Sequence, residues 1–455
     1  MLSFNQEDFS MLIRATFENL FSFNSPQTIS FVAGRTKTLP NHVVASSNRR
    51  DPNILKAAIV YGANASGKSN LVKCFDFARR LILRGTRADD IIPRRPFKLE
   101  KTAGRRPSSF EFEISVDRKI YAYKAVFDER EVIEERLTLI GKTAEKELFH
   151  RTTQNGKVKI AEGNFLKKAE EKKFFQFIAQ GTRPNQLFLR ETIDRNAAWF
   201  RPVYDWFKDR LVIIYPDSKS DSIEFLVRSN ERLKDNYTKF FENFDLGIDG
   251  IEVAEIDFNT ELENIPKVIR DDIAKTLLPG KSMTLLNAFG QNYRFVREDD
   301  GTLKAFRMLV RHLSPDGSEP VLFDLMEESD GTNRLIDLIP ALVAMADSEN
   351  LFLIDEIDRS MHSQLSRAFF EFFFTHSKKT SQVLATTHEL DLLDLELFRK
   401  DEIWFVEKDR SSMSHLYSLE EFKPRYDKDI RRGYLQGRFG AIPIVKNMGS
   451  DEWVL

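Results

Sequence analysis

The eight residues GANASGKS, positions 62–69, decide how the rest of the sequence is interpreted. They follow the apolar run LKAAIVY at 55–61, which predicts a buried strand, and they precede NLVKCFDFARRLIL at 70–83. In the second segment apolar residues recur at spacings of three and four, which predicts one face of an amphipathic helix. A G-x-x-x-x-G-K-S pattern between a strand and a helix is typical of a phosphate-binding loop.

The small residues of this loop allow consecutive backbone N–H groups to point at phosphate oxygens, and the positive end of the following helix adds to the attraction. We expect Lys68 to bridge the terminal phosphates of ATP and Ser69 to ligate Mg²⁺. The alternative, an ordinary glycine-containing turn, leaves the matching strand and helix unexplained. The residues predicted to contact the nucleotide are Gly62, Asn64, Ala65, Ser66, Gly67, Lys68, Ser69 and Asn70.

The segment LFLIDE at 351–356 is an apolar run that ends in two carboxylates. In a nucleotide hydrolase, Asp355 would hold the magnesium shell and Glu356 would orient and deprotonate the attacking water. The alternative is that the pair caps the helix expected to begin near Ser360, because acidic residues favour helix N-termini. The phosphate-binding loop upstream favours the catalytic interpretation.

His388 ends the predicted strand QVLATTH at 382–388. A lone histidine is more often structural than catalytic. Ligand sites in open α/β sheets lie at the carboxyl ends of strands, however, and His388 stands at that end of its strand. We therefore predict that His388 senses the γ-phosphate of ATP.

The segment ESDGT at 328–332 precedes the helical run RLIDLIPAL. One interpretation is structural: Ser329 or Thr332 caps the helix and Gly331 forms a tight turn. The other is functional, since a small-residue turn that opens a helix can receive an anion, such as the γ-phosphate held by a second subunit. Both interpretations stay open, and the candidate residues are Ser329, Asp330, Gly331 and Thr332.

The order of predicted elements indicates an α/β protein. From residue 333 onward helices and strands alternate, which is typical of a parallel sheet covered by helices. The range 109–151 predicts an antiparallel meander. We expect an N-terminal lobe with this meander at 1–165, a mostly helical insertion at 166–293 and a C-terminal lobe at 294–455. No heptad repeat is sustained over roughly three heptads, so we expect no long coiled coil.

Composition excludes several classes of protein. The 455 residues contain 68 Lys and Arg against 70 Asp and Glu, so the surface as a whole is not built to bind nucleic acid or a membrane. The single cysteine, Cys74, excludes disulfide scaffolds and cysteine zinc sites within one chain. No run approaches the ~20 apolar residues of a bilayer span, and Met1–Ser10 lacks the pattern of a secretion signal, so we expect a cytoplasmic protein.

One local charge cluster departs from this balance. Residues 79–106 contain ten Lys or Arg against three acidic residues. Such a segment is either a solvated loop or a surface for nucleic acid or a partner protein. Binding to nucleic-acid phosphates would weaken steeply as salt rises, which separates the two interpretations.

Taken in chain order, GANASGKSN, SDGT, LFLIDEID and ATTH resemble an ABC-type ATPase head of the kind found in SMC and DNA-repair proteins. More closely, they resemble stand-alone ATPases related to the OLD proteins and to abortive-infection phage defence, a group that includes the ATPase subunit of the PARIS system. The segments MLIRATFENLFSF, LPNHV, PFKL and YLQGRFGAIP extend this similarity over nearly the whole chain. Ala65 departs from the glycine usual in SMC heads, and no glutamine between Ser69 and Gln154 can be assigned to a Q-loop.

The resemblance implies roles for the candidate residues. Lys68 would act in the Walker A loop, Ser69 and Asp355 at magnesium, Glu356 as the base and His388 as the switch. Residues 329–332 would act as a signature across a dimer of heads, in trans. The implied cofactors are ATP and Mg²⁺, and the implied assembly is a homodimer or a larger homo-oligomer.

The resemblance also implies an ATP-dependent sensor or scaffold in antiviral defence, triggered by DNA or a phage protein. The residues after His388 are too few for the nuclease domain that OLD proteins carry, so we expect a separate effector, a nuclease or toxin. Two alternatives stay open. One is a DNA-repair or SMC-like head that clamps DNA, and the other is an oligomeric scaffold whose ATPase activity is incidental.

Overall fold

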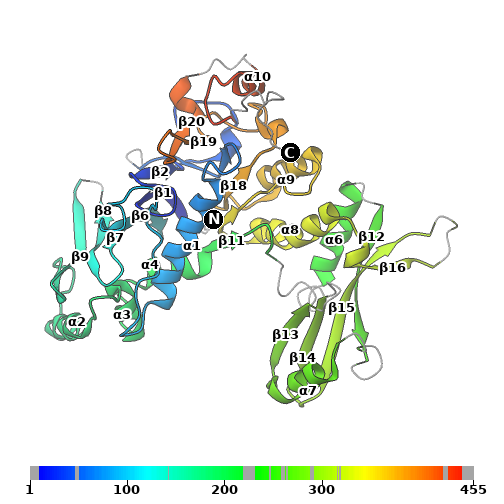
Figure 1. The fold of residues 1–455 in the computed structure, drawn as a ribbon, viewed down its shortest axis with the longest axis horizontal. Helices are drawn as coiled ribbons and strands as arrows, with labels where there is room; N and C mark the ends of the chain where they lie inside the picture. Colours follow the sequence, from blue (N-terminus) through cyan, green and yellow to red (C-terminus); the bar gives the residue numbers. More distant parts are fainter. Residues whose placement is uncertain are drawn as a thin grey trace, which may run out of the picture. The chain divides into compact units, whose positions relative to one another are not determined.

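The computed structural model describes residues 10–46, 51–141, 143–218, 231–244, 247–257, 262, 265–286, 292–314, 316, 319–423 and 429–442 (Figure 1). The chain forms two compact units. The first consists of Met1–Pro216, Asp347–Asp358 and Phe370–Leu455, and the second of Asp217–Ala346 and Arg359–Phe369.

The first unit contains a six-stranded sheet in the order β11-β17-β18-β5-β19-β20. Its first five strands run parallel, and β20 pairs antiparallel with β19. All five residues of β5 are buried, as expected for a strand covered on both faces. The helix α1 follows β5 through the loop at 62–67. The bounds are β5 Ala57–Tyr61, α1 Lys68–Arg84, β11 Leu211–Ile214, β17 Leu351–Ile354, β18 Gln382–Thr387, β19 Ile403–Lys408 and β20 Ser414–Ser418.

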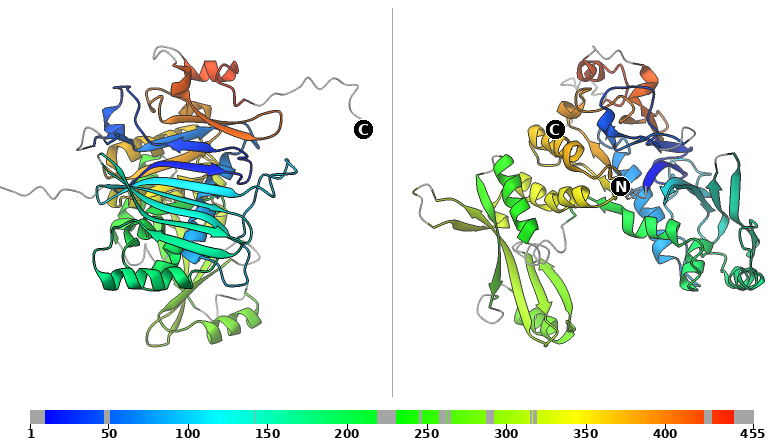
Figure 2. Two further views of the ribbon diagram at one scale, coloured as in Figure 1. Left: turned by 90° about the vertical axis from the view of Figure 1, so that its left-hand side faces the viewer. Right: turned by 180° about the vertical axis from the view of Figure 1, so that it is seen from behind.

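A seven-stranded antiparallel sheet, β10-β9-β8-β7-β6-β1-β2, forms the other layer of the first unit (Figure 2). Its β6 to β9 confirm the meander predicted at 109–151. Phe75 of α1 packs edge-on against Phe17 and Phe112 of this sheet, which fixes the helix that follows the phosphate-binding loop. The bounds are β1 Met11–Glu18, β2 Gln27–Ser30, β6 Ser108–Val116, β7 Lys119–Phe127, β8 Val132–Ile140, β9 Glu145–Gln154 and β10 Lys157–Glu162.

Short elements complete the first unit. The strands β3 and β4 pair with each other, and a π-helical turn at Trp206–Arg210 leads into β11. The bounds are β3 Val43–Val44, β4 Ile54–Leu55, α2 Ala169–Gly181, α3 Phe188–Asp194, α4 Arg201–Asp205 and α10 Ile430–Leu435; α9, at Ser363–His376, begins in the second unit.

The second unit is built on a sheet of order β12-β15-β14-β13, with β16 paired to β15. Ile273 of α7 is buried with Tyr293, Phe295 and Ala305 of the sheet, so this unit has its own apolar core. The bounds are α6 Glu231–Asn243, β12 Ile248–Ile256, α7 Lys267–Thr276, β13 Lys281–Leu286, β14 Asn292–Arg297, β15 Leu303–His312, β16 Val321–Asp324 and α8 Asp330–Asp347.

The mixed α/β fold predicted from the sequence is confirmed. The range 166–293 contains helices together with the strands β11 to β13 and the first residues of β14. Because β11 and β17 are neighbours in the parallel sheet, the larger segment of the second unit, Asp217–Ala346, is an insertion between two adjacent strands, and its smaller segment, Arg359–Phe369, follows β17. The domain boundaries expected at 165 and 293 stay a prediction. The two compact units are divided at other residues.

The longest helices are short for a coiled-coil arm. The helix α8 has 18 residues and α1 has 17, so the described part of the chain contains no long coiled coil. Among the same residues no helix combines the length and apolarity that a bilayer crossing requires.

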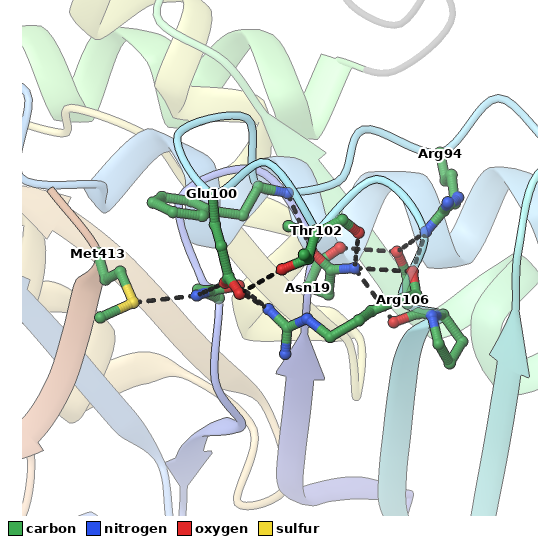
Figure 3. A network of polar contacts seen from close by, with 11 residues as sticks. Asn19, Arg94, Glu100, Thr102, Arg106 and Met413 are labelled. Carbon is green, nitrogen blue, oxygen red and sulfur yellow. Dashed lines mark hydrogen bonds and ion pairs between the residues drawn. The ribbon is translucent and has the colours of Figure 1, made fainter. Parts of the chain in front are cut away.

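The basic segment at 79–106 is only partly a solvated loop (Figure 3). Arg94 is buried, and its guanidinium donates to the carbonyls of Gly104 and Arg106 at 2.5 and 2.7 Å. The guanidinium of Arg106 pairs with the Glu100 carboxylate at 2.9 Å, and the Asn19 amide donates to the Arg106 carbonyl at 2.9 Å. The side chains of two of the ten cations therefore bind other residues of the same loop and hold it together.

Candidate nucleotide-binding site

The loop at 62–67 has the backbone that a phosphate cradle needs. Ala65 and Gly67 lie in the left-handed region, with φ of 62° and 121°. A Cβ at Gly67 would collide with the hydroxyl of Ser414, and a Cβ at Gly62 would collide with the Val406 carbonyl. Both glycines are therefore required by close approach, and at Gly67 also by the backbone conformation.

Two serines outside the motif support this loop. Ser414 Oγ lies 2.5 Å from the carbonyl oxygen of Ser66 and 2.7 Å from Ser22 Oγ. The Asn70 amide donates to Ser22 Oγ at 2.9 Å. Sequence reasoning missed both serines, because Ser22 lies 48 positions before Asn70 and Ser414 lies 348 positions after Ser66, and no local pattern links either to the loop. The loop is fixed before any ligand arrives, which lowers the ordering cost of binding.

The members of the predicted cradle differ in exposure. Asn64 and Ala65 are exposed at the tip of the loop, and Ser69 and Asn70 are half-buried at the start of α1. Ser66 is buried, and its hydroxyl has no hydrogen-bond partner within the described residues. A buried hydroxyl without a partner is costly unless a ligand satisfies it.

Lys68 is buried at the first position of α1, and its ammonium turns back to the loop. Nζ donates to the carbonyls of Gly62 and Ala63 at 2.7 and 3.2 Å, and it lies 3.3 Å from Nδ1 of His388. Burial lowers the pKa of Lys68 to about 8, although the carboxylates of Asp358 and Glu356 oppose the shift. Among the described residues, Lys68 is therefore a cation without a carboxylate within hydrogen-bonding distance.

The two carboxylates at 355 and 356 follow β17 at the carboxyl edge of the parallel sheet. Asp355 is buried and accepts a hydrogen bond of 2.7 Å from Thr386 Oγ1. The same hydroxyl accepts the Glu356 N–H at 2.8 Å. Glu356 has a φ of 49°, unusual for a residue with a side chain, and its side chain is half-buried. Thr386 thus holds the carboxylate of Asp355 and the backbone of Glu356, and sequence reasoning missed it although it lies in the quoted strand QVLATTH.

His388 follows β18 on the same edge, where its strand lies between β17 and β5. Its backbone N–H donates to Asp358 at 3.0 Å. Burial and the nearby Lys68 lower the pKa of the ring, so it is neutral at pH 7. A neutral ring protonated on Nε2 presents the Nδ1 lone pair to the Lys68 ammonium.

The structure brings Lys68, Asp355, Glu356 and His388 together at one edge of the first unit. The candidates at 329–332 belong to the second unit. There the Thr332 N–H donates to Ser329 Oγ at 3.1 Å, so Ser329 caps α8. A Cβ at Gly331 would meet the carbonyl oxygen of Ser360 at 2.5 Å. These contacts support the structural interpretation of the segment, and its role toward a nucleotide stays a prediction.

The donor set fits Mg²⁺ together with a nucleotide. A hard cation takes oxygen ligands, and magnesium is usually held by one or two protein oxygens with substrate phosphates. Ser69, at the start of α1 after β5, supplies a hydroxyl, and Asp355, after β17, supplies a carboxylate. No group of three or more His, Cys, Asp or Glu side chains that could hold a metal alone occurs among the described residues.

Comparison with solved structures finds SMC head domains. The SMC head bound to the C-winged helix domain of ScpA is 14% identical, with a TM-score of 0.43, over 90% of this chain and 99% of that one. The SMC head domain from Thermotoga maritima is 13% identical, with a TM-score of 0.36, over 90% and 98%. An SMC head with an extended coiled coil, bound to the C-terminal domain of ScpA and derived from Pyrococcus furiosus, is 13% identical, with a TM-score of 0.37, over 91% and 100%.

No curated protein matches the sequence. A family model does match, over residues 57–394, and its description is "AAA domain, putative AbiEii toxin, Type IV TA system". This range includes the strand before the phosphate-binding loop, both carboxylates and His388. Because the match spans well over half of the chain, the protein belongs to this family of AAA domains.

Proposed function

We propose that this protein binds ATP with Mg²⁺ and hydrolyses it to ADP and phosphate. The observation that carries the proposal is the set of hydrogen bonds that joins Thr386 to Asp355 and Glu356, next to the contact between Lys68 and His388. Five side chains, carried by α1 and by the ends of the neighbouring parallel strands β17 and β18, meet at the edge where open α/β sheets bind ligands.

Each residue has a role that follows from its position. The N–H groups of the loop at 62–67 and the ammonium of Lys68 bind the phosphates. Ser69 and Asp355 would hold Mg²⁺. The ion would neutralise the negative charge that develops on the transferred phosphoryl group. Glu356 orients and deprotonates the attacking water. His388, neutral and beside Lys68, reports on the terminal phosphate.

Burial of Lys68 gives the site its preference for a polyanion. The pKa of about 8 reflects a desolvated ammonium that water no longer stabilises. A phosphate at Nζ replaces the lost solvation and competes with the carbonyls of Gly62 and Ala63. Binding energy is thus concentrated at the position of the terminal phosphates.

The nucleotide cycle, we further propose, controls a separate effector in antiviral defence. The description of the family names a putative toxin and a type IV toxin–antitoxin system, which favours action with a partner protein. Assembly as a homo-oligomer would allow residues 329–332 of one copy to approach the nucleotide of another. Co-purification with the products of neighbouring genes, with and without ATP, tests this part.

The hydrolytic part is tested by Glu356→Gln, which removes the base and keeps the shape of the side chain. ATP turnover should fall by roughly 100-fold while ATP affinity is retained. Glu396→Gln is the matched control, because Glu396 is exposed in the same unit and outside the site. Turnover that is equal in Glu356→Gln and wild type would refute hydrolysis at this site.

A further inference from the structure

A cavity of about 600 Å³ lies along α1 in the first unit, on residues that the site above does not use. Four cationic side chains line it, and only one carboxylate does, that of Asp76. The cations are Lys73, Arg80, Arg84 and Arg95. Three of them belong to the basic segment at 79–106, whose role the sequence left open.

Within the described residues, the positive charge of this cavity is only partly neutralised. Asp76 forms an ion pair with Arg80 and accepts a hydrogen bond of 2.8 Å from the Tyr215 hydroxyl. In the part of the chain that the structure describes, Lys73, Arg84 and Arg95 have no ion-pair partner. Like charges gathered in one cavity repel each other, so an anion that enters it gains both attraction and relief of that repulsion.

The backbone that carries these cations is held in place. The carbonyl of Arg95 accepts the Phe21 N–H at 2.7 Å, and the preceding residue, Arg94, is buried with its guanidinium bonded to loop carbonyls. Arg84 ends α1, whose apolar face is packed in the core. The basic segment thus contains two kinds of arginine: Arg94 and Arg106 anchor the loop, whereas Arg84 and Arg95 line the cavity.

Aromatic side chains accompany the cations. Phe21, Phe77 and Tyr215 line the same cavity. Ring faces together with Lys and Arg are the combination that binds nucleotides outside sequence-specific sites: the base stacks and the phosphate pairs with the cations. A volume of about 600 Å³ is within the ordinary range for a small-ligand pocket.

We propose that this cavity binds the phosphate and base of a nucleotide, as a second site distinct from the phosphate-binding loop. The nucleotide is either free or at the end of a single strand, since both present the same phosphate and ring. The proposal does not depend on ATP hydrolysis.

The cavity is joined to the first site through two short links. Lys73 lies one helical turn after Ser69 on α1. Phe21 precedes Ser22, which accepts a hydrogen bond from Asn70 and contacts Ser414 beneath the loop. A ligand in the cavity therefore contacts the residue next to a support of the phosphate-binding loop.

The test measures binding of two probes to the full-length chain in EDTA, where the magnesium-dependent site is disfavoured. The probes are fluorescein-labelled hexathymidylate, followed by anisotropy, and unlabelled thymidine monophosphate as a competitor. Arg84→Glu and Arg95→Glu should each raise the Kd of the hexamer by roughly tenfold, and the salt dependence of binding should decrease. Lys73→Gln removes the charge and keeps part of the aliphatic side chain, and it should also raise the Kd of the hexamer.

Arg105→Glu is the matched control: it makes the same change of charge in the same basic segment, at an exposed residue outside the cavity. It should change the Kd less than twofold. An equal loss in Arg105→Glu would show diffuse attraction and overturn the proposal, as would unchanged binding in all three cavity variants or no binding by wild type. Thermal unfolding verifies that each variant is folded.

Competition decides the source of the nucleotide. Displacement of the hexamer by thymidine monophosphate assigns the cavity to free nucleotides, and resistance to displacement assigns it to a strand end. Hexaglutamate should not displace the labelled hexathymidylate. Displacement by hexaglutamate as effective as by thymidine monophosphate would show that the cavity accepts any anion and would overturn recognition of phosphate.

Discussion

The Lys68 ammonium lies 3.3 Å from Nδ1 of His388, although 320 positions separate the two residues in the chain. Both groups have a lowered pKa, and in both the largest cause is burial. The pair therefore places a desolvated cation against a neutral ring at the mouth of the parallel sheet. We therefore expect a polyphosphate that binds at this site to shift the protonation equilibrium of Lys68 before that of any other group.

Nucleotide affinity should fall as the pH rises above about 8. The free protein has a Lys68 pKa of about 8, and a bound phosphate stabilises the ammonium and raises that value. Binding then takes up a proton above pH 8, so affinity should weaken by about tenfold per pH unit until the bound-state pKa is reached. Calorimetry with a non-hydrolysable ATP analogue between pH 6.5 and 9.5, in roughly half-unit steps, measures this profile.

Lys68→Arg is the control for that profile, because a guanidinium remains charged over the whole range. Its affinity should be lower than that of wild type and nearly independent of pH. A wild-type affinity that stays flat from pH 7 to 9.5 would contradict titration of Lys68 in this range.

Thr386→Val should reduce ATP turnover by more than its effect on stability explains. The hydroxyl donates to the Asp355 carboxylate and accepts the Glu356 N–H, so valine leaves this carboxylate and the Glu356 backbone without their common support. We expect a loss of about 1–3 kcal/mol in the free energy of unfolding and an increased requirement for Mg²⁺.

Thr387→Val is matched to this variant. Thr387 is equally buried on the same strand, and its hydroxyl accepts the Glu389 N–H at 2.9 Å, away from the two carboxylates. It should lose a similar amount of stability with an unchanged magnesium requirement. Equal magnesium curves for the two variants would remove Thr386 from the site.

The parts of the site that the sequence predicts are those encoded by neighbouring residues. GANASGKS at 62–69 lies between an apolar strand and an amphipathic helix, and these three features fall within one short window. The alternation of helix and strand after residue 333 likewise predicts the parallel sheet, whose strands are buried on both faces. The relative order of the strands follows from pairing across the fold, which no local pattern encodes.

The residues that support the site are those that local patterns miss. Ser414 reaches the Ser66 carbonyl from β20, and only the antiparallel pairing of β19 with β20 places it there. The sequence alone does not distinguish the ten Lys and Arg residues of the basic segment from one another. The contacts separate them, because Arg94 is buried among carbonyls whereas Arg95 lines a cavity. Charge patterns give the composition of a segment, and burial decides what each charge does.

Ser414→Ala should weaken ATP binding by roughly three- to tenfold with little change in the fold. The substitution removes the hydroxyl next to the Ser66 carbonyl and Ser22, and so loosens the loop whose backbone binds phosphate. Ser411→Ala, at an exposed residue in the preceding turn, serves as the control and should bind ATP as wild type does. An unchanged affinity in Ser414→Ala would show that the loop holds its shape without this support.

The buried pair of Glu135 and Arg151 should be important for stability and neutral for the chemistry. Glu135 accepts the N–H groups of Phe188 and Leu189 at 2.6 and 2.9 Å, which joins β8 to the start of α3. The Arg151 guanidinium lies 3.6 Å from the carboxylate, and both side chains are fully buried. Burial raises the pKa of Glu135, and Arg151 opposes that shift.

Arg151→Met should therefore cost about 3–5 kcal/mol in urea unfolding, because it leaves a buried carboxylate without its cation. The double variant Glu135→Gln with Arg151→Met should recover part of this loss, since the amide keeps an oxygen for the N–H groups of Phe188 and Leu189 without a charge to compensate. ATP turnover per folded molecule should be equal in both variants and wild type. If the double variant is as unstable as the sum of its two single variants, the two side chains are not coupled, and the stability of this sheet has another origin.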